Sequence, residues 1–171
     1  MAKNLKQFIT EHKDFPKKGI LFKDLLPILQ QPDVFGDLIE KMSSSEIFNG
    51  TEAIIAIDAR GFIFGTAISI KLSKPMIVAR KPGKLPGDLV SKSYSLEYGT
   101  NSLSIQKKAL EKYNSFVIVD DLLATGGTVK CVSEILAESG KKINGLSVVA
   151  ELAFFNAKKL LPFPVKSEII F

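Results

Sequence analysis

The sequence contains no tryptophan, one cysteine and one histidine among its 171 residues. One cysteine, Cys131, cannot form an internal disulfide or build a cysteine-based metal site, which is typical of an intracellular, reduced protein. One histidine, His12, excludes multi-histidine metal sites, and a Ser-His-Asp triad would depend on that residue alone. We expect Cys131 to lie in the core and His12 to be exposed rather than catalytic.

Long apolar runs are also absent. The longest uncharged stretch, residues 61–70, has ten residues, whereas about 20 are needed to cross a bilayer. Charged residues are spread through the first eighteen positions and leave no room for the apolar centre of a signal peptide. The sequence therefore predicts a cytoplasmic protein without a membrane-spanning segment.

The charge of the chain is unevenly distributed. Lysine and arginine total 23 and the acids 18, and the segment 71–92 holds six basic residues against the single acid Asp88: Lys71, Lys74, Arg80, Lys81, Lys84 and Lys92. Such a segment is compatible with nucleic acid, with a phosphorylated metabolite, or with a solvated face. Only Arg60 and Arg80 are arginines, which suggests that these two positions need a planar, bidentate donor.

The order of apolar segments predicts one α/β domain. We expect buried strands over 53–57, 76–79, 116–119, 146–150 and 165–170, and helices over 3–12, 32–47, 60–72, 128–139 and 156–161. Residues 90–97 and 101–106 alternate enough to form a hairpin. This alternation predicts a parallel sheet with helices on both faces, in which ligands bind outside the carboxyl ends of the strands.

The strongest motif follows the strand expected over 116–119. Asp120 and Asp121 end that strand, and residues 124–128, Ala-Thr-Gly-Gly-Thr, lead directly into a helix. Glycines let backbone N–H groups approach an anion, and a helix N-terminus adds about half a positive charge. The spacing fits neither a Walker A loop nor a dinucleotide fingerprint. The two acids could hold ribose hydroxyls or Mg²⁺. A turn that uses glycine only for its geometry, with Thr125 or Thr128 as N-cap, stays an alternative.

This motif resembles the hallmark of the type I phosphoribosyltransferases. The resemblance implies a parallel sheet flanked by helices, with a small N-terminal hood over about residues 1–32. The core would cover about 33–171 and carry a flexible hairpin lid over about 84–106. It further implies a homodimer that uses Mg²⁺ and binds 5-phosphoribosyl 1-pyrophosphate (PRPP). The ribose of PRPP would be held by Asp120 and Asp121. The 5′-phosphate of PRPP would be held by the loop residues Ala124, Thr125, Gly126, Gly127 and Thr128.

Four further segments, 14–25, 58–65, 80–87 and 93–99, resemble the adenine-using members of that family in order and spacing. They imply the reaction of adenine with PRPP to give AMP and pyrophosphate, a purine salvage step. Residues 58–61 lead from a strand into a helix, where N–H groups and an arginine could hold pyrophosphate, although Arg60 could also be a plain surface arginine. The resemblance implies a cis peptide at Asp58–Ala59 or its neighbour, and pyrophosphate binding by Arg60, Gly61, Arg80, Lys81 and Lys84. The basic segment then needs no nucleic acid.

The remaining implied roles concern the lid and the base. Residues 84–99 mix glycine, proline, serine and tyrosine, as expected for a mobile lid. By resemblance, Glu97 is the acid near purine N7, Tyr98 closes over the site, and Arg60 completes the catalytic set.

The base pocket would be formed by Leu21, Phe22, Lys23 and Leu122, with backbone groups reading the edge of adenine. A core role for Phe22 is equally open. Many relatives carry arginine where this chain has Lys23, so a guanidinium contribution would be lost while backbone recognition survives.

Two other functions stay open. A sister transferase would use another purine or a pyrimidine. A nonenzymatic regulator would keep the phosphoribosyl loop and bind nucleic acid through its basic face, which predicts an added DNA-binding domain or a broad basic stripe with aromatic platforms. We favour the enzyme because the basic segment is short and falls on the expected pyrophosphate side.

Overall fold

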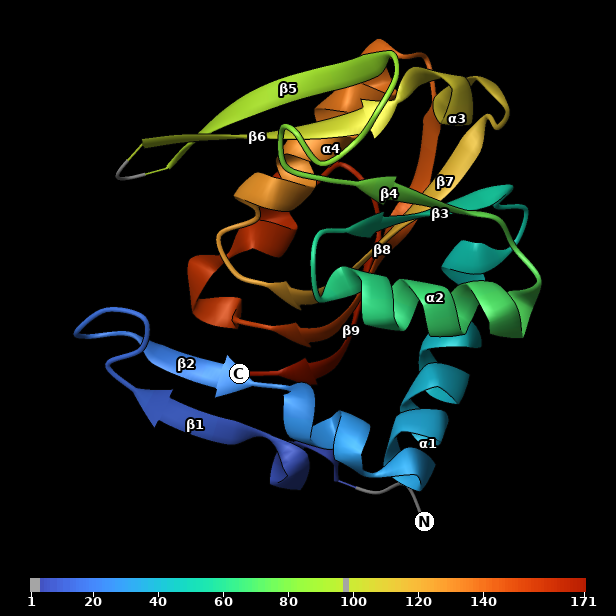
Figure 1. The fold of residues 1–171 in the computed structure, drawn as a ribbon. Coiled ribbons are helices and arrows are strands. Elements are labelled where there is room, and N and C mark those ends of the chain that lie inside the picture. Colours follow the sequence, from blue (N-terminus) through green and yellow to red (C-terminus); the bar gives the residue numbers. More distant parts are fainter. Residues whose placement is uncertain (1–3, 97–98) are drawn as a thin grey trace.

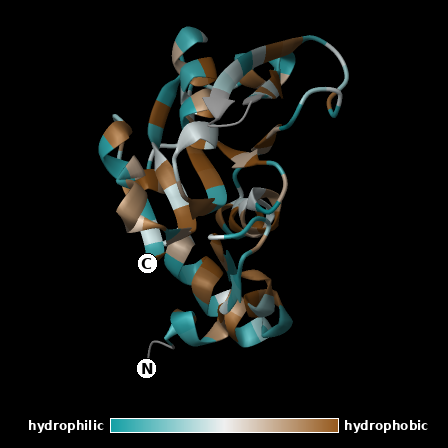
Figure 2. Ribbon diagram, turned by 90° about the vertical axis from the view of Figure 1, so that its left-hand side faces the viewer, coloured by the Kyte–Doolittle hydropathy of each residue, from teal (hydrophilic) through white to brown (hydrophobic). Residues whose placement is uncertain are grey.

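The computed structural model describes residues 4–96 and 99–171. Its centre is a sheet of five parallel strands in the order β4-β3-β7-β8-β9. The strands are β3 (Ala53–Ile57), β4 (Met76–Ala79), β7 (Ser115–Leu123), β8 (Lys142–Glu151) and β9 (Val165–Ile170). All five residues of β3 are buried, as expected for a strand covered on both faces. Figure 2 shows apolar residues concentrated in these central strands.

Helices cover the sheet on both sides (Figure 1). Helix α4 (Gly127–Glu138) packs on one face, in a core cluster that includes Ile118 of β7. Helices α1 (Pro32–Ser43) and α2 (Gly61–Leu72) pack on the other face, in a cluster that includes Val117 and Val119. Neighbouring residues of β7 therefore serve opposite cores, because side chains alternate along a strand. The predicted α/β class and parallel sheet are confirmed.

Two antiparallel hairpins lie outside this sheet. The first joins β1 (Thr10–Lys13) to β2 (Leu21–Asp24), and the second joins β5 (Leu89–Leu96) to β6 (Gly99–Gln106). In Figure 1 the first hairpin lies beside β9 and the second extends away from the core. The short remaining elements are α3 (Lys107–Glu111), η1 (Leu5–Phe8), η2 (Leu26–Gln30), η3 (Glu46–Phe48), η4 (Ala153–Phe155) and η5 (Ala157–Leu160).

Several expected elements differ from the observed ones. The strand expected over 146–150 begins at Lys142, and the helix expected over 156–161 is only the short 3₁₀ helix η5. The helix expected over 3–12 is wrong beyond Phe8, because Thr10–Lys13 pairs with β2 instead. The helix expected over 32–47 ends at Ser43, where a run of serines begins. Strand β7 continues to Leu123, since β8 pairs with it as far as Glu151. Both acids of the motif are therefore held within a paired strand. In the described part of the chain, no helix is long and apolar enough to span a bilayer.

Candidate active site

Two arginine–aspartate pairs lie at the carboxyl ends of neighbouring strands. Nε of Arg60, at the start of α2, lies 2.7 Å from Oδ2 of Asp121 in β7. Nε of Arg80, directly after β4, donates a hydrogen bond of 3.0 Å to Oδ2 of Asp58, which follows β3. The two arginines that the sequence singled out therefore lie on one edge of the sheet, each oriented by a carboxylate.

The approach of α2 to β7 requires a glycine at position 61. A Cβ added to Gly61 would lie 2.9 Å from Oδ1 of Asp120 and 3.0 Å from the carbonyl oxygen of Val119. The turn before the helix contains a cis peptide between Asp58 and Ala59, as the resemblance implied. The missing side chain at Gly61 lets the start of α2 approach β7, which brings Arg60 within reach of Asp121.

The acid pair itself is largely withdrawn from solvent. Burial raises the pKa of Asp120 well above its ordinary value, and the neighbouring charge of Asp121 raises it further. Oδ1 of Asp120 accepts a hydrogen bond of 2.8 Å from the backbone N–H of Asp121. Buried carboxylates of this kind gain from hydroxyl donors that satisfy their oxygens, which suits the hydroxyls of a sugar.

The loop over 124–128 has the geometry of an anion site. Gly126 is the N-cap of α4 and has φ +83°, a conformation that side chains rarely adopt. A Cβ added there would lie 3.1 Å from Cβ of Ala157. The first N–H groups of a helix have no partner within the helix. Thr125 is exposed and the other residues of 124–128 are partly buried. The loop therefore offers donors to a phosphate.

The other predicted cations lie farther along the β4–β5 connection. The guanidinium of Arg80 donates a 3.4 Å hydrogen bond to the carbonyl oxygen of Lys84, which holds the start of this connection against the sheet. Lys81 and Lys84 are exposed. Their contact with pyrophosphate stays a prediction.

A pocket of about 330 Å³ opens between the first hairpin and Arg60, lined by His12, Phe15, Phe22, Asp24, Leu26 and Arg60. The ring of Phe22 contacts that of Phe15 edge to face, with centroids 5.1 Å apart. The guanidinium carbon of Arg60 lies 5.3 Å from the Phe22 centroid. Arg60 thus belongs both to this mostly apolar pocket and to the edge that carries the acid pair.

The structure does not bring together the four residues predicted for the base pocket. Phe22 lines the pocket, whereas Leu21 and Lys23 are not among the lining residues and alternate with Phe22 along β2. Lys23 forms an ion pair with Glu11, and its Nζ lies 4.3 Å from the ring centroid of Phe171. Leu122 is partly buried against the core that contains α1 and α2. Because the side chain of Lys23 faces Glu11 and Phe171, only the backbone of Lys23 is placed to take part in base recognition.

Sequence reasoning missed His12 as a lining residue. His12 pairs with Phe22 in the register of the hairpin, and its Nε2 lies 4.0 Å from Oδ2 of Asp24. We expected a helix over 3–12, which is incompatible with this pairing. A strand prediction for residues 10–13 would have been needed to locate the imidazole beside Phe22. Glu97 and Tyr98, the predicted lid residues, lie outside the described residues.

The donor set fits a metal ion that arrives with a phosphorylated substrate. Within residues 4–96 and 99–171, no group of three or more His, Cys, Asp or Glu side chains could hold a metal ion. Mg²⁺ is commonly bound by one or two carboxylates together with substrate phosphates. Asp120 and Asp121 supply that number of carboxylates beside the anion loop.

Comparison with known proteins agrees with this geometry. A sequence model of the phosphoribosyl transferase domain matches residues 24–159. The adenine phosphoribosyltransferase of Prochlorococcus marinus strain MIT 9211 is 69% identical, over 100% of this chain and 99% of that protein. The one from Mycoplasmopsis fermentans is 42% identical, over 98% and 96% of the two chains.

Solved structures give the same assignment. The adenine phosphoribosyltransferase of Thermoanaerobacter pseudethanolicus superposes with a TM-score of 0.92 at 40% identity, over 100% of both chains. The Saccharomyces cerevisiae enzyme, complexed with an imino-altritol bisphosphate and adenine, gives 0.89 at 34% identity over 97% of both chains. The chain therefore belongs to the phosphoribosyltransferase family. Within this family it belongs to the adenine phosphoribosyltransferases.

Proposed function

We propose that this protein transfers the phosphoribosyl group of PRPP to adenine, giving AMP and pyrophosphate in purine salvage. The observation that carries the proposal is the 2.7 Å pair between Arg60 and Asp121. This pair joins the start of α2, expected to hold pyrophosphate, to the strand that leads into the phosphate loop. The 330 Å³ pocket that Arg60 shares with Phe22 provides space for a planar base beside them.

The reaction breaks the bond between C1′ and the pyrophosphate oxygen and forms a bond from C1′ to N9 of adenine on the opposite face. Positive charge develops on the ribose as pyrophosphate leaves with its electron pair, and the proton of N9 passes to the released pyrophosphate or to water. Catalysis is then mainly positioning and electrostatic stabilisation. Asp120 and Asp121 orient the ribose hydroxyls, and the 124–128 loop fixes the 5′-phosphate.

The leaving group needs positive charge. Arg60, Arg80, Lys81 and Lys84 stabilise the developing pyrophosphate, and Gly61 lets backbone donors approach it. Mg²⁺ held by Asp120, Asp121 and the substrate oxygens supplies further charge neutralisation when bound. Glu97 hydrogen-bonds or protonates the N7 region of the purine, and Tyr98 helps the lid exclude water, which would otherwise capture the reactive ribose.

We further propose that the protein is a homodimer in the cytoplasm. Each subunit consists of a hood over residues 1–32 and a core over 33–171, and the core carries a lid over 84–106. The separate hairpins β1–β2 and β5–β6 support this division. The single cysteine supports a reducing compartment. Light scattering after size exclusion tests the dimer, and a monomer with full activity would overturn it.

A steady-state assay tests the function. Purified protein, Mg²⁺ and PRPP are combined with adenine, hypoxanthine, guanine, xanthine, uracil or orotate while pyrophosphate release is followed. We expect turnover with adenine alone. Turnover with another base would overturn the pocket assignment and indicate a sister transferase. No turnover with any base would favour the nonenzymatic regulator, to be tested by nucleic-acid binding.

A further inference from the structure

The side chain of Tyr94 on β5 covers the first residues of α4. A Cβ added to Gly127 would lie 3.2 Å from Cδ2 and 3.4 Å from Cε2 of the Tyr94 ring. The Tyr94 hydroxyl lies 3.4 Å from Oγ1 of Thr128. The hairpin therefore contacts two consecutive residues of the loop that is expected to bind the 5′-phosphate.

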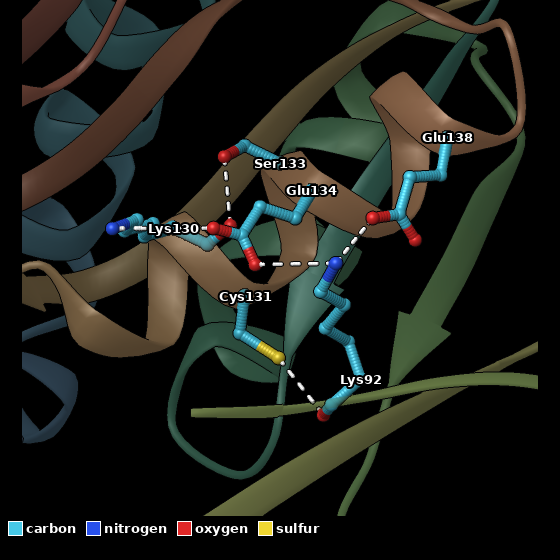
Figure 3. A network of polar contacts seen from close by, with 6 residues as sticks. All are labelled: Lys92, Lys130, Cys131, Ser133, Glu134 and Glu138. Carbon is cyan, nitrogen blue, oxygen red and sulfur yellow. Dashed lines mark hydrogen bonds and ion pairs between the residues drawn. The ribbon is translucent and has the colours of Figure 1, made fainter. Parts of the chain in front are cut away.

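A second attachment holds the same strand on α4. Lys92, two residues before Tyr94, forms an ion pair with Glu138, and its Nζ lies 3.7 Å from Oε2 of Glu134 (Figure 3). Sγ of Cys131 donates a 3.2 Å hydrogen bond to the carbonyl oxygen of Lys92. Because Lys92 and Tyr94 point to the same face of the strand, these contacts keep the tyrosine ring seated on the loop.

We propose that Tyr94 is a positioning residue that orders the 5′-phosphate loop and connects it to the lid; this inference rests on the proposed function. A phosphate dianion has no proton and can only accept hydrogen bonds. A threonine hydroxyl that contacts it must therefore donate its single proton to the phosphate. Oγ1 of Thr128 then accepts from the Tyr94 hydroxyl, which fixes the direction of the bond. The ring meanwhile restrains the backbone of Gly127, because it lies directly against that residue.

The arrangement also gives the lid a response to substrate. Tyr94 precedes Glu97 by three residues in the sequence, so the strand that contacts the phosphate loop leads directly into the segment expected to carry the acid. A bound 5′-phosphate that orders Gly127 and Thr128 also stabilises the seat of Tyr94. We therefore expect PRPP, rather than adenine, to be the substrate that responds to changes at this residue.

Two variants separate the hydroxyl from the ring. Tyr94→Phe should weaken PRPP binding about threefold, because one neutral hydrogen bond is lost. Tyr94→Ala should weaken it about tenfold or more, because the loop also loses its cover. Calorimetric titration with PRPP and Mg²⁺, and separately with ribose 5-phosphate, measures this directly. KM for PRPP should rise in parallel, with kcat and KM for adenine changed less than twofold. Tyr113→Phe, whose ring contacts Phe116 at a centroid distance of 6.5 Å, is the matched control and should leave all values unchanged.

A size exchange tests the contact itself. Gly127→Ala should weaken PRPP binding more in the wild-type background than in Tyr94→Ala, because the new methyl group meets the ring only when the ring is present. Additive effects, or wild-type affinity in both Tyr94 variants, would overturn the inference. Since these titrations do not depend on turnover, a protein that binds PRPP through Tyr94 but transfers to no base would contradict the proposed function alone.

Discussion

Nε of Arg60 lies 2.7 Å from Oδ2 of Asp121, so an ion pair joins the N-cap of α2 to β7. The carboxylate holds the charged end of Arg60 at the carboxyl end of β7. A cation positioned in this way before the reaction can stabilise a leaving anion more strongly than a mobile one.

Replacing the planar guanidinium of Arg60 by the ammonium group of a lysine should impair the enzyme. We expect Arg60→Lys to lower kcat/KM for PRPP about 100-fold, since lysine cannot contact Asp121 and pyrophosphate in one bidentate geometry. Steady-state kinetics with varied PRPP measures the change. Lys71→Arg, at the other end of the same helix and paired with Glu40, is the control. Full activity of Arg60→Lys would remove the planar donor from the mechanism.

Gly61 and Gly36 make a matched pair of helix glycines. A Cβ on Gly61 would lie 2.9 Å from Oδ1 of Asp120, whereas a Cβ on Gly36 meets nothing within 4 Å. Gly61→Ala should therefore lower the free energy of unfolding by about 2 kcal/mol and reduce activity. Gly36→Ala should raise the free energy of unfolding by about 0.5–1 kcal/mol without an effect on activity. Urea unfolding measures the free energy of unfolding of both variants. Equal changes in Gly61→Ala and Gly36→Ala would contradict the close approach of α2 to β7.

The raised pKa of Asp120 predicts a pH-dependent cost in stability. The folded state keeps a proton on Asp120 to a higher pH than the unfolded chain does, so this carboxyl lowers the free energy of unfolding as the pH rises from the ordinary aspartate range toward the raised pKa. Asp120→Asn removes that cost. We expect its thermal midpoint to exceed that of the wild type by about 3 °C at pH 7 and to match it near pH 4.

The same substitution should harm function. The amide introduced by Asp120→Asn would still accept from the Asp121 N–H but lacks the charge that attracts ribose hydroxyls and Mg²⁺, so PRPP affinity should fall about tenfold. The double variant Asp120→Asn, Asp121→Asn should lose more. Calorimetric titration measures the affinity, and unaltered PRPP binding in the double variant would contradict the assignment of the acid pair.

The sequence predicted the sheet well because its strands carry their signal locally. The bounds 53–57, 76–79 and 165–170 agree with β3, β4 and β9, since each is a short segment of strand-forming residues between turns. The acid pair and the glycine loop were likewise found from one continuous motif. Their contact with Arg60 could be expected only from the general rule that carboxyl ends of parallel strands meet at one edge.

The first hairpin was not predictable in the same way. Residues 10–13 are all exposed, so they lack the apolar alternation that marks a strand, and pairing with β2 decides their conformation. The inserted residues 14–20 include Asp14 at φ +58° and a cis Phe15–Pro16 bond, which no periodicity indicates. Without that hairpin, the face of Lys23 and the position of His12 could not be derived.

Lys23 offers a test of how the hood is held. Its Nζ lies 4.3 Å from the Phe171 ring centroid, on a strand face that the pocket does not include. Lys23→Arg should keep this cation–π contact and wild-type kinetics. Lys23→Met and Phe171→Leu should each raise KM for adenine about threefold, because β2 and therefore Phe22 lose a restraint.

The double variant makes the Lys23 prediction specific. Lys23→Met combined with Phe171→Leu should cost less than the sum of the two single changes, since both remove the contact between Lys23 and Phe171. KM for PRPP should stay constant throughout, and Lys166→Met, which breaks the surface pair with Glu46, should change neither constant. A loss of activity in Lys23→Arg as large as that in Lys23→Met would instead assign a direct role in base recognition to the ammonium group.

A substitution at Glu97 distinguishes an effect on the chemical step from an effect on PRPP binding. Glu97→Gln keeps the size of the side chain but removes its acid, and a positioned general acid contributes about 10²–10⁴-fold. We expect kcat to fall within that range while PRPP affinity is unchanged, because the acid pair and the 124–128 loop are intact. Glu111→Gln, at the exposed end of α3, is the control. Unchanged turnover would exclude Glu97 from the mechanism, and loss of PRPP binding would assign it to the sugar half of the site. A fall in kcat alone would mean that the lid contributes chemistry as well as closure.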